Sequence, residues 1–282
     1  MTLVCAWAAA APLAYVVDSD NPGNAEKLHR VDLATGDFSV VGPVDPNYPD
    51  IEGLTFTADG RLLGVDDASK SLFQFDLDSA AITAYGGLRG SLNPTLPLGT
   101  AVDPSVALTC DGQMLAATGT GRLFRLDLDT GRATQIGNGA SLPLEIADIA
   151  VKGDDVYAVN RTQLLRINVS NGTAQVIGTF DGDLFPSGGG LAFDAEGQLW
   201  AIADRAPNPS PIYRINVLTG VATRVGSTPL PGIESLAIAP AKCGVAPTQI
   251  IPTPIPASGS ISLTILGLIT GLLGALALLR RR

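Results

Sequence analysis

The segment LFRLDLDTGRATQIG, from Leu123 to Gly137, decides the fold because close variants of it recur along the chain. The variants begin at Leu72 (LFQFDLDSAAITAYG), Leu164 (LLRINVSNGTAQVIG) and Ile212 (IYRINVLTGVATRVG). Each variant predicts a strand with alternating apolar and polar side chains, a turn and a second strand. Successive copies start roughly 40 to 50 residues apart, which is the period of four-stranded propeller blades.

A second pattern precedes each copy and completes the repeat. It covers residues 52–65, 104–117, 147–159 and 189–202, and each of these segments predicts a hairpin. The turns are Asp59-Gly60, Asp111-Gly112, Gly153-Asp154 and Glu196-Gly197, which tolerate the positive φ of a tight hairpin. Each full unit therefore predicts four antiparallel strands.

The two ends of the repeat region predict a fifth unit. ESLAIAP, from Glu234, supplies only a first strand, whereas residues 13–18, 28–36 and 38–42 supply the other three. Joining them predicts an all-β, five-bladed β-propeller over residues 13–244, closed by pairing of the N- and C-terminal strands. A ring of this kind protects its strand edges. A hairpin-rich sandwich is the alternative, but it does not predict two complementary fragments at the ends.

The repeat region resembles a broad class of bacterial proteins. Residues 13–240 are similar to bacterial repeat propellers, whose third strands read like LHRVDLATG at residues 28–36. This resemblance implies the fold and leaves the function open, because propellers carry many unrelated functions.

Both ends of the chain predict export. Residues 261–279, ISLTILGLITGLLGALALL, contain no charge and are long enough as a helix to span a bilayer. Arg280, Arg281 and Arg282 follow, so the positive-inside rule places the propeller outside the cytoplasm. Residues 245–260 predict a Pro-rich linker, and residues 1–12, MTLVCAWAAAAP, resemble the end of a signal peptide. We expect an exported protein anchored in the membrane by its C-terminal helix.

The last thirty or so residues resemble the sorting tails of the PEP-CTERM and IPTL-CTERM families. The residues that carry the resemblance are Pro252, Thr253, Pro254 and Pro256, together with the arginine cluster at 280–282. Residues 251–254 read IPTP and lack the leucine of IPTL, and residues 254–256 lack the glutamate of PEP. The resemblance implies an exosortase-like sorting protease as a partner, with release to the cell surface after processing. A plain tail anchor is the alternative.

Charge and cysteine content exclude several classes. The formal net charge is −9, so an acidic surface would repel nucleic acid. Three cysteines, Cys5, Cys110 and Cys243, are too few for a disulfide scaffold and lack zinc-site spacing. The repeat register places Cys110 and Cys243 on non-adjacent blades, which argues against a bond between them.

The candidate site is a set of acidic residues on one face of the ring. Glu52 and Glu234 occupy equivalent positions before the first strands of neighbouring blades. Asp18, Asp66 and Asp204 end second strands, which lie on the same face. Two interpretations remain open: these residues hold a hard cation such as Ca²⁺, which prefers oxygen ligands, or they are hydrogen-bonding turn residues. No other cofactor is expected.

The sequence favours a binding or structural module for a surface or matrix ligand over an enzyme. His29, the single histidine, aligns with Phe73, Phe124, Leu165 and Tyr213 and is expected to be packed in the interior. A hydrolase with a histidine base is therefore not expected. The alternative is a metal-dependent lactonase or a glycoside-cleaving enzyme with Glu52 and Glu234 as its catalytic carboxylates.

Overall fold

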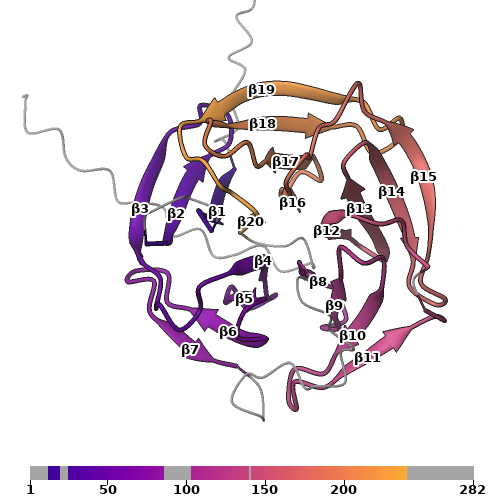
Figure 1. Ribbon diagram of the computed structural model, residues 1–282, viewed down its shortest axis with the longest axis horizontal. Coiled ribbons are helices and arrows are strands. Elements are labelled where there is room, and N and C mark those ends of the chain that lie inside the picture. Colours follow the sequence, from indigo (N-terminus) through magenta and orange to yellow (C-terminus); the bar gives the residue numbers. More distant parts are fainter. Residues whose placement is uncertain (1–11, 20–24, 86–102, 140, 240–282) are drawn as a thin grey trace, which may run out of the picture. The chain divides into compact units, whose positions relative to one another are not determined.

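The computed structural model describes residues 12–19, 25–85, 103–139 and 141–239. Within them, twenty strands form five four-stranded antiparallel sheets, arranged as the blades of a ring (Figure 1). The innermost strands of neighbouring blades contact one another around the whole ring. The predicted all-β, five-bladed propeller is confirmed.

The blades are numbered along the chain, and the strands of each are named from the innermost outward. Blade one consists of β4 (Ile51–Phe56), β5 (Leu62–Asp66), β6 (Ser71–Phe75) and β7 (Ile82–Ala84). Blade two consists of β8 (Ser105–Leu108), β9 (Met114–Ala117), β10 (Leu123–Leu126) and β11 (Ala133–Ile136). Blade three consists of β12 (Ile146–Lys152), β13 (Asp155–Asn160), β14 (Gln163–Asn168) and β15 (Thr173–Thr179). Blade four consists of β16 (Gly189–Phe193), β17 (Leu199–Ala203), β18 (Ser210–Ile215) and β19 (Ala222–Thr228).

Blade five joins the two ends of the propeller. Its strands are β20 (Ala237–Ile238), β1 (Leu13–Val17), β2 (Lys27–Asp32) and β3 (Phe38–Pro43). Ala14 pairs with Ile238 and Tyr15 with Ala237 in antiparallel register. In Figure 1 the orange β20 accordingly lies beside the indigo β1. The predicted closure of the ring by the N- and C-terminal strands is confirmed.

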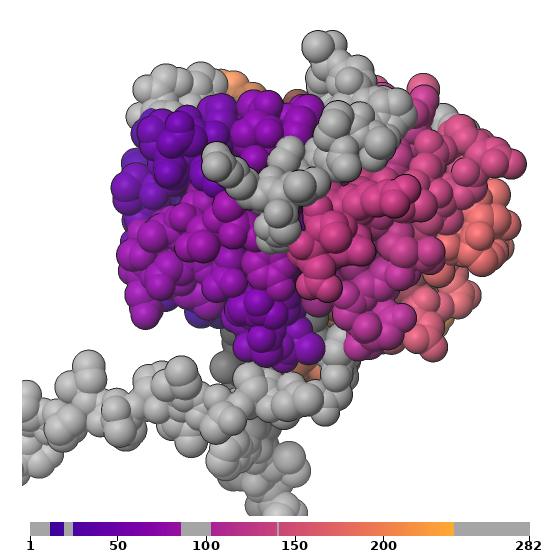
Figure 2. Space-filling model, turned by 90° about the horizontal axis from the view of Figure 1, so that it is seen from below, coloured from indigo at the N-terminus to yellow at the C-terminus, as the bar shows by residue number. Residues whose placement is uncertain are grey.

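Burial decreases from the channel to the rim and follows the sequence pattern. β8, β9 and β17 are buried along their whole length, so their residues are continuously apolar or small. The third strands, such as β14, alternate buried and exposed side chains because only one of their faces packs on a neighbouring blade. The outermost β15 is mostly exposed. Figure 2 shows the purple blade one packed against the magenta blade two.

Glycines at the ends of fourth strands let neighbouring blades approach closely. A Cβ added to Gly178 would lie 2.2 Å from the Thr219 carbonyl oxygen in the β18–β19 turn of the next blade. A Cβ on Gly42 would lie 2.4 Å from the Ser79 carbonyl oxygen in the turn of blade one. The turn of one blade therefore packs closely against the outer strand of its neighbour. At the contact the strand residue has room for the hydrogen of glycine but not for a Cβ atom.

The channel is narrow along its middle. A space of about 40 Å³ remains there, lined by residues 54–56, 106–108, 149–151, 191–193 and 236–238 of the five innermost strands. These residues are apolar except Thr55, whose Oγ1 accepts a hydrogen bond of 3.2 Å from the Leu108 N–H of the next blade. The middle of the channel is therefore narrow and almost wholly apolar.

The predicted ends of the chain lie outside the described residues. Contacts divide the chain into Met1–Pro247 and Thr248–Arg282, and the second unit contains the predicted helix and arginine cluster. The linker and most of the signal-peptide segment also lie outside the described part. Among the described residues no helix has the length and apolar character to cross a membrane. The transmembrane helix and the sorting motif remain predictions.

Candidate functional site

The site lies at the end of the channel where the innermost strands begin. All five innermost strands run in the same direction, so the residues that precede them meet on one face of the ring. They line a cavity of about 590 Å³. Its wall carries six acidic side chains and one basic side chain: Asp50, Glu52, Asp67, Asp103, Glu145 and Glu234, with Arg161. The cavity is therefore strongly acidic.

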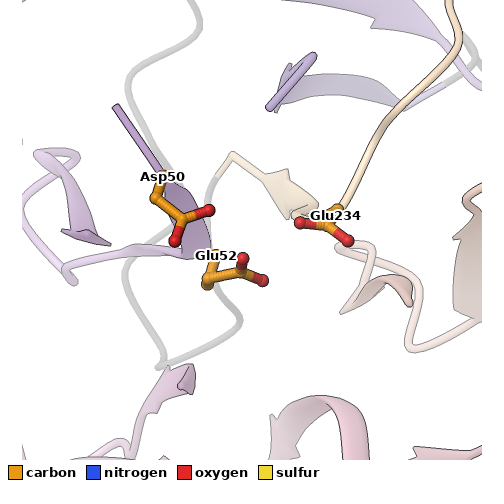
Figure 3. Close-up of side chains that lie close together, drawn as sticks. All are labelled: Asp50, Glu52 and Glu234. Carbon is orange, nitrogen blue, oxygen red and sulfur yellow. The ribbon is translucent and has the colours of Figure 1, made fainter. Parts of the chain in front are cut away.

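Three of these carboxylates form a cluster. One oxygen from each of Asp50, Glu52 and Glu234 lies within 4.8 Å of the other two. Figure 3 shows their side chains lying close together, from two segments that are far apart in sequence. Asp50 directly precedes β4, Glu52 lies on β4, and Glu234 precedes β20. The described part of the chain contains no other group of three or more His, Cys, Asp or Glu residues with metal-site geometry.

A β-bulge places Glu52 in this cluster. Ile51 pairs with Asp66 and Gly53 pairs with Val65, so Glu52 is an extra residue with no partner in the ladder. Bulges redirect one side chain relative to the regular alternation of a strand. Blade three has the same bulge, but its extra residue is Ala147. Of these two blades, only blade one has a carboxylate side chain at the bulge.

The cluster is electrostatically strained. The pKa of Glu52 is raised well above its ordinary value, chiefly because burial removes water from the carboxylate. The negative charge of Glu234 and a hydrogen bond with it raise this pKa further, followed by the charges of Asp50 and Asp103. A cation bound between these oxygens would remove the repulsion, and a proton on Glu52 would remove part of it.

Asp66 and Asp204 lie behind the cluster and hold its backbone in place. Asp66 is fully buried, and its Oδ1 accepts a hydrogen bond of 2.7 Å from the Asp50 N–H. Asp204 is also buried, and its Oδ1 accepts one of 3.0 Å from the N–H of Gly232, two residues before Glu234. The structure therefore places both residues as supports for segments that carry the clustered carboxylates, and outside the group with metal-site geometry.

Asp18 is buried in blade five and is not among the residues that line the cavity. Its Oδ1 accepts a hydrogen bond of 2.6 Å from the Lys27 N–H, and its Oδ2 lies 3.3 Å from His29 Nε2. His29 is 2 % exposed and packs edge to face on Phe38, with 5.7 Å between ring centroids. The histidine is thus an interior residue that substrate in the cavity could not reach.

Sequence reasoning brought together Glu52 and Glu234 but missed four cavity residues: Asp50, Asp103, Glu145 and Arg161. Asp50, Asp103 and Glu145 lie one or two residues before innermost strands, and this position was the available signal. Arg161 follows β13 and forms ion pairs with Glu145, at 3.6 Å, and Asp183. No pattern in the repeat marks an arginine at that position, because the equivalent residues of the other blades differ.

Comparisons with known proteins identify a fold and no family. A scan against protein-family models and a search of curated proteins found no match to this chain. Among solved structures, a chain from the nidogen/laminin complex is 11 % identical, with a TM-score of 0.52 over 83 % of this chain and 100 % of that chain. The likeness concerns the fold alone.

Two bacterial structures show weaker likeness. Virginiamycin B lyase from Staphylococcus aureus is 18 % identical, with a TM-score of 0.39 over 70 % of this chain and 62 % of that chain. TolB from Acinetobacter baumannii is 15 % identical, with a TM-score of 0.46 over 80 % of this chain and 54 % of that chain. The aligned region thus spans less than two thirds of either protein.

Proposed function

We propose that this protein is an exported, surface-displayed propeller that binds its ligand at the channel mouth, through a Ca²⁺ ion held by Asp50, Glu52 and Glu234. The observation that carries the proposal is the convergence of the three carboxylates within 4.8 Å on the wall of the 590 Å³ cavity. Ca²⁺ takes six to eight oxygen ligands, so the ion would retain positions for water or for oxygens of a bound ligand.

The shape of the cavity supports a binding function. The space between the innermost strands is narrow and apolar, whereas the cavity that contains the cluster is wide and acidic. A polar ligand would therefore bind in the acidic cavity rather than deeper in the channel. A hydroxyl- or carboxylate-bearing surface or matrix glycan has the oxygen atoms that complete a Ca²⁺ shell.

Calorimetric titration with Ca²⁺ tests the site. We expect the wild-type chain to bind one ion and to gain thermal stability as the ion concentration rises, because a ligand of the folded state stabilises it by mass action. Glu52→Gln and Glu234→Gln should each lose this response. Glu196→Gln is the matched control, since Glu196 is exposed in a hairpin at the opposite end of the blade. Absence of any Ca²⁺ effect on the wild type would refute the cation site.

Two features support export. The first is the predicted tail, with its apolar segment 261–279 and terminal arginines. The second is Cys110, which is disulfide-bonded, because structural disulfides persist in oxidising compartments outside the cytoplasm. We therefore extend the proposal to membrane anchoring, followed by processing between Pro252 and Ala257 by an exosortase-like protease.

Fractionation of the producing cell tests this part. We expect the full chain in the membrane or at the cell surface, and a chain ending at Ser260 in the soluble exported fraction. Mass spectrometry of the mature C-terminus distinguishes a tail that is cut by a sorting protease from a tail that stays as a membrane anchor. An end between Pro252 and Ala257 supports sorting, whereas an intact Arg282 indicates a plain anchor.

A metal-dependent lactonase is the second candidate, favoured by a cavity large enough for a small substrate beside the carboxylates. Glycoside cleavage fits less well, because its two carboxyl groups stand about 5 Å or more apart, whereas Glu52 and Glu234 share a hydrogen bond. Hydrolysis of a lactone panel in Ca²⁺, abolished in Glu52→Gln and retained in Glu196→Gln, would favour the enzyme. Ca²⁺ binding without hydrolysis would favour the binding module.

A further inference from the structure

The carboxylate of Glu234 lies against a residue that has no side chain. Gly188 lines the cavity directly before β16, and its φ of +132° is one that L side chains rarely adopt. A Cβ atom added to Gly188 would lie 3.0 Å from Glu234 Oε1, which is closer than ordinary van der Waals contact. Glu234 is buried and shares a hydrogen bond with Glu52, so its carboxylate is not free to move aside. A side chain at position 188 would therefore compete with Glu234 for space.

Asp204 fixes both segments that form this contact. Its backbone N–H donates a hydrogen bond of 3.1 Å to the Gly188 carbonyl oxygen. Its Oδ1 accepts hydrogen bonds of 3.0 Å from the Gly232 N–H and of 2.7 Å from the Ala206 N–H. Gly232 lies two residues before Glu234 in the chain. One buried residue thus links the wall beside the Glu234 carboxylate to the segment that carries Glu234.

The equivalent position of blade one has a carboxylate instead of a glycine. The Asp67 N–H donates a hydrogen bond of 2.7 Å to the Asp50 carbonyl oxygen, which matches the bond from Asp204 to Gly188 in blade four. Asp50 and Gly188 therefore occupy the same place in their blades, just before the innermost strand. Asp50 contributes an oxygen to the cluster, whereas Gly188 leaves space for a carboxylate of the next blade. The repeat is therefore asymmetric at the position where the cluster forms.

We infer that Gly188 and Asp204 are positioning residues of the proposed Ca²⁺ site. Gly188 leaves the space in which the Glu234 carboxylate lies, and Asp204 holds Gly188 and Gly232 at the separation that this contact requires. The consequence for binding rests on the proposed function, because it requires Glu234 to be a ligand of the ion. Removal of groups that orient metal ligands typically weakens metal binding by about 10- to 100-fold.

Calorimetric titration of two glycine series with Ca²⁺ tests the role of Gly188. We expect Gly188→Ala to bind Ca²⁺ about tenfold more weakly than wild type and Gly188→Leu to lose binding, because the longer side chain displaces Glu234 further. Gly182→Ala and Gly182→Leu are the matched controls. Gly182 lies in the same connection between β15 and β16, has a φ of +88°, and has no heavy atom within 4 Å of an added Cβ. Both series should lose stability through backbone strain, but the controls should keep wild-type affinity. Equal Ca²⁺ affinities in the two series would overturn the inference.

Two Asp204 variants test the same role if the Gly188 variants fold poorly. Asp204→Asn keeps a side-chain oxygen that can accept the Gly232 N–H, so it should keep wild-type affinity for Ca²⁺. Asp204→Ala removes this acceptor and should bind Ca²⁺ at least about tenfold more weakly. Wild-type affinity in Asp204→Ala would show that Asp204 does not position Glu234.

Crystal structures of the calcium-free wild type and Gly188→Leu separate this inference from the cation site itself. In the wild type we expect one oxygen from each of Asp50, Glu52 and Glu234 within 4.8 Å of the others. In Gly188→Leu the Glu234 carboxylate should lie outside this distance. An unmoved Glu234 would contradict the positioning role, whatever the wild type binds. Displacement of Glu234 together with no Ca²⁺ binding by the wild type would refute the proposed function and leave the positioning role established.

Discussion

At the scale of the single residue, Glu52 is placed where its charge is costly to the fold. Burial and the neighbouring Glu234, Asp50 and Asp103 raise its pKa in the folded chain. The folded chain therefore keeps a proton on Glu52 at pH values where the unfolded chain has released it. Stability is lost as pH rises from the ordinary value of 4.5 through the raised value, because the unfolded state then binds fewer protons than the folded state.

Glu52→Gln removes this cost and should stabilise the chain in calcium-free buffer at neutral pH. We expect its Tm to exceed that of wild type by about 3 °C, the shift produced by roughly 1 kcal/mol in a domain of this size. The difference should vanish below about pH 4, where Glu52 is protonated in both states. Saturating Ca²⁺ should reverse the order, since only the wild type binds the ion. Thermal melts across pH, with and without Ca²⁺, measure the sign of the Tm difference under each condition. Glu196→Gln is the control. A Glu52→Gln variant that melts below wild type at neutral pH without Ca²⁺ would contradict this expectation.

The repeat alignment predicted that Glu52 and Glu234 would be neighbours, because equivalent positions in adjacent blades meet around a closed ring. The repeat alignment did not predict that Asp50 would lie beside them. Its place in the cluster depends on a bulge at Glu52 and on the hydrogen bond from its N–H to Asp66, which are three-dimensional details. Asp66 and Asp204 were grouped with the cluster because they share its face, but their oxygens accept hydrogen bonds from backbone N–H groups.

At the scale of the element, the glycines that end the fourth strands have different surroundings. Gly178 of blade three and Gly226 of blade four occupy equivalent repeat positions. A Cβ on Gly178 would meet the Thr219 carbonyl oxygen, whereas one on Gly226 would have no heavy atom within 4 Å. The sequence predicted both as strand ends and could not separate them, because the difference lies in how the next blade's turn approaches.

Gly178→Ala should destabilise the protein by about 2 kcal/mol or more, since the β18–β19 turn must move away or the strand must shift. Gly226→Ala should be neutral or stabilising by up to about 1 kcal/mol, because alanine loses less backbone entropy on folding. Urea denaturation of the two variants beside wild type gives the comparison. Equal losses in both would mean that the contact between blade three and the turn of blade four contributes nothing.

At the scale of the whole molecule, closure couples the ends of the repeat region to both neighbouring blades. β20 contacts β4 of blade one and β16 of blade four, in addition to pairing with β1. The five-bladed ring and this closure were predictable because the first and last fragments complement each other in the repeat. The full acidic cluster was less predictable, because the segments that precede the innermost strands meet at the channel only in three dimensions.

Leu236→Ala should therefore destabilise more than β20, the strand that Leu236 directly precedes. Leu236 is 1 % exposed and packs with residues of blades four and five, so its truncation should cost about 3 kcal/mol. Since β20 fills the gap between β16 and β4, amide exchange should accelerate in both of these strands and remain unchanged in β14 and β15. Leu144→Ala is the control, because Leu144 is 65 % exposed and its truncation should shift stability by less than about 0.5 kcal/mol. Acceleration confined to residues 234–239 would show that the blades are stable independently of the closing strand. Acceleration in β4 and β16 would show that the ring unfolds as one cooperative unit and that blade five is its least stable part.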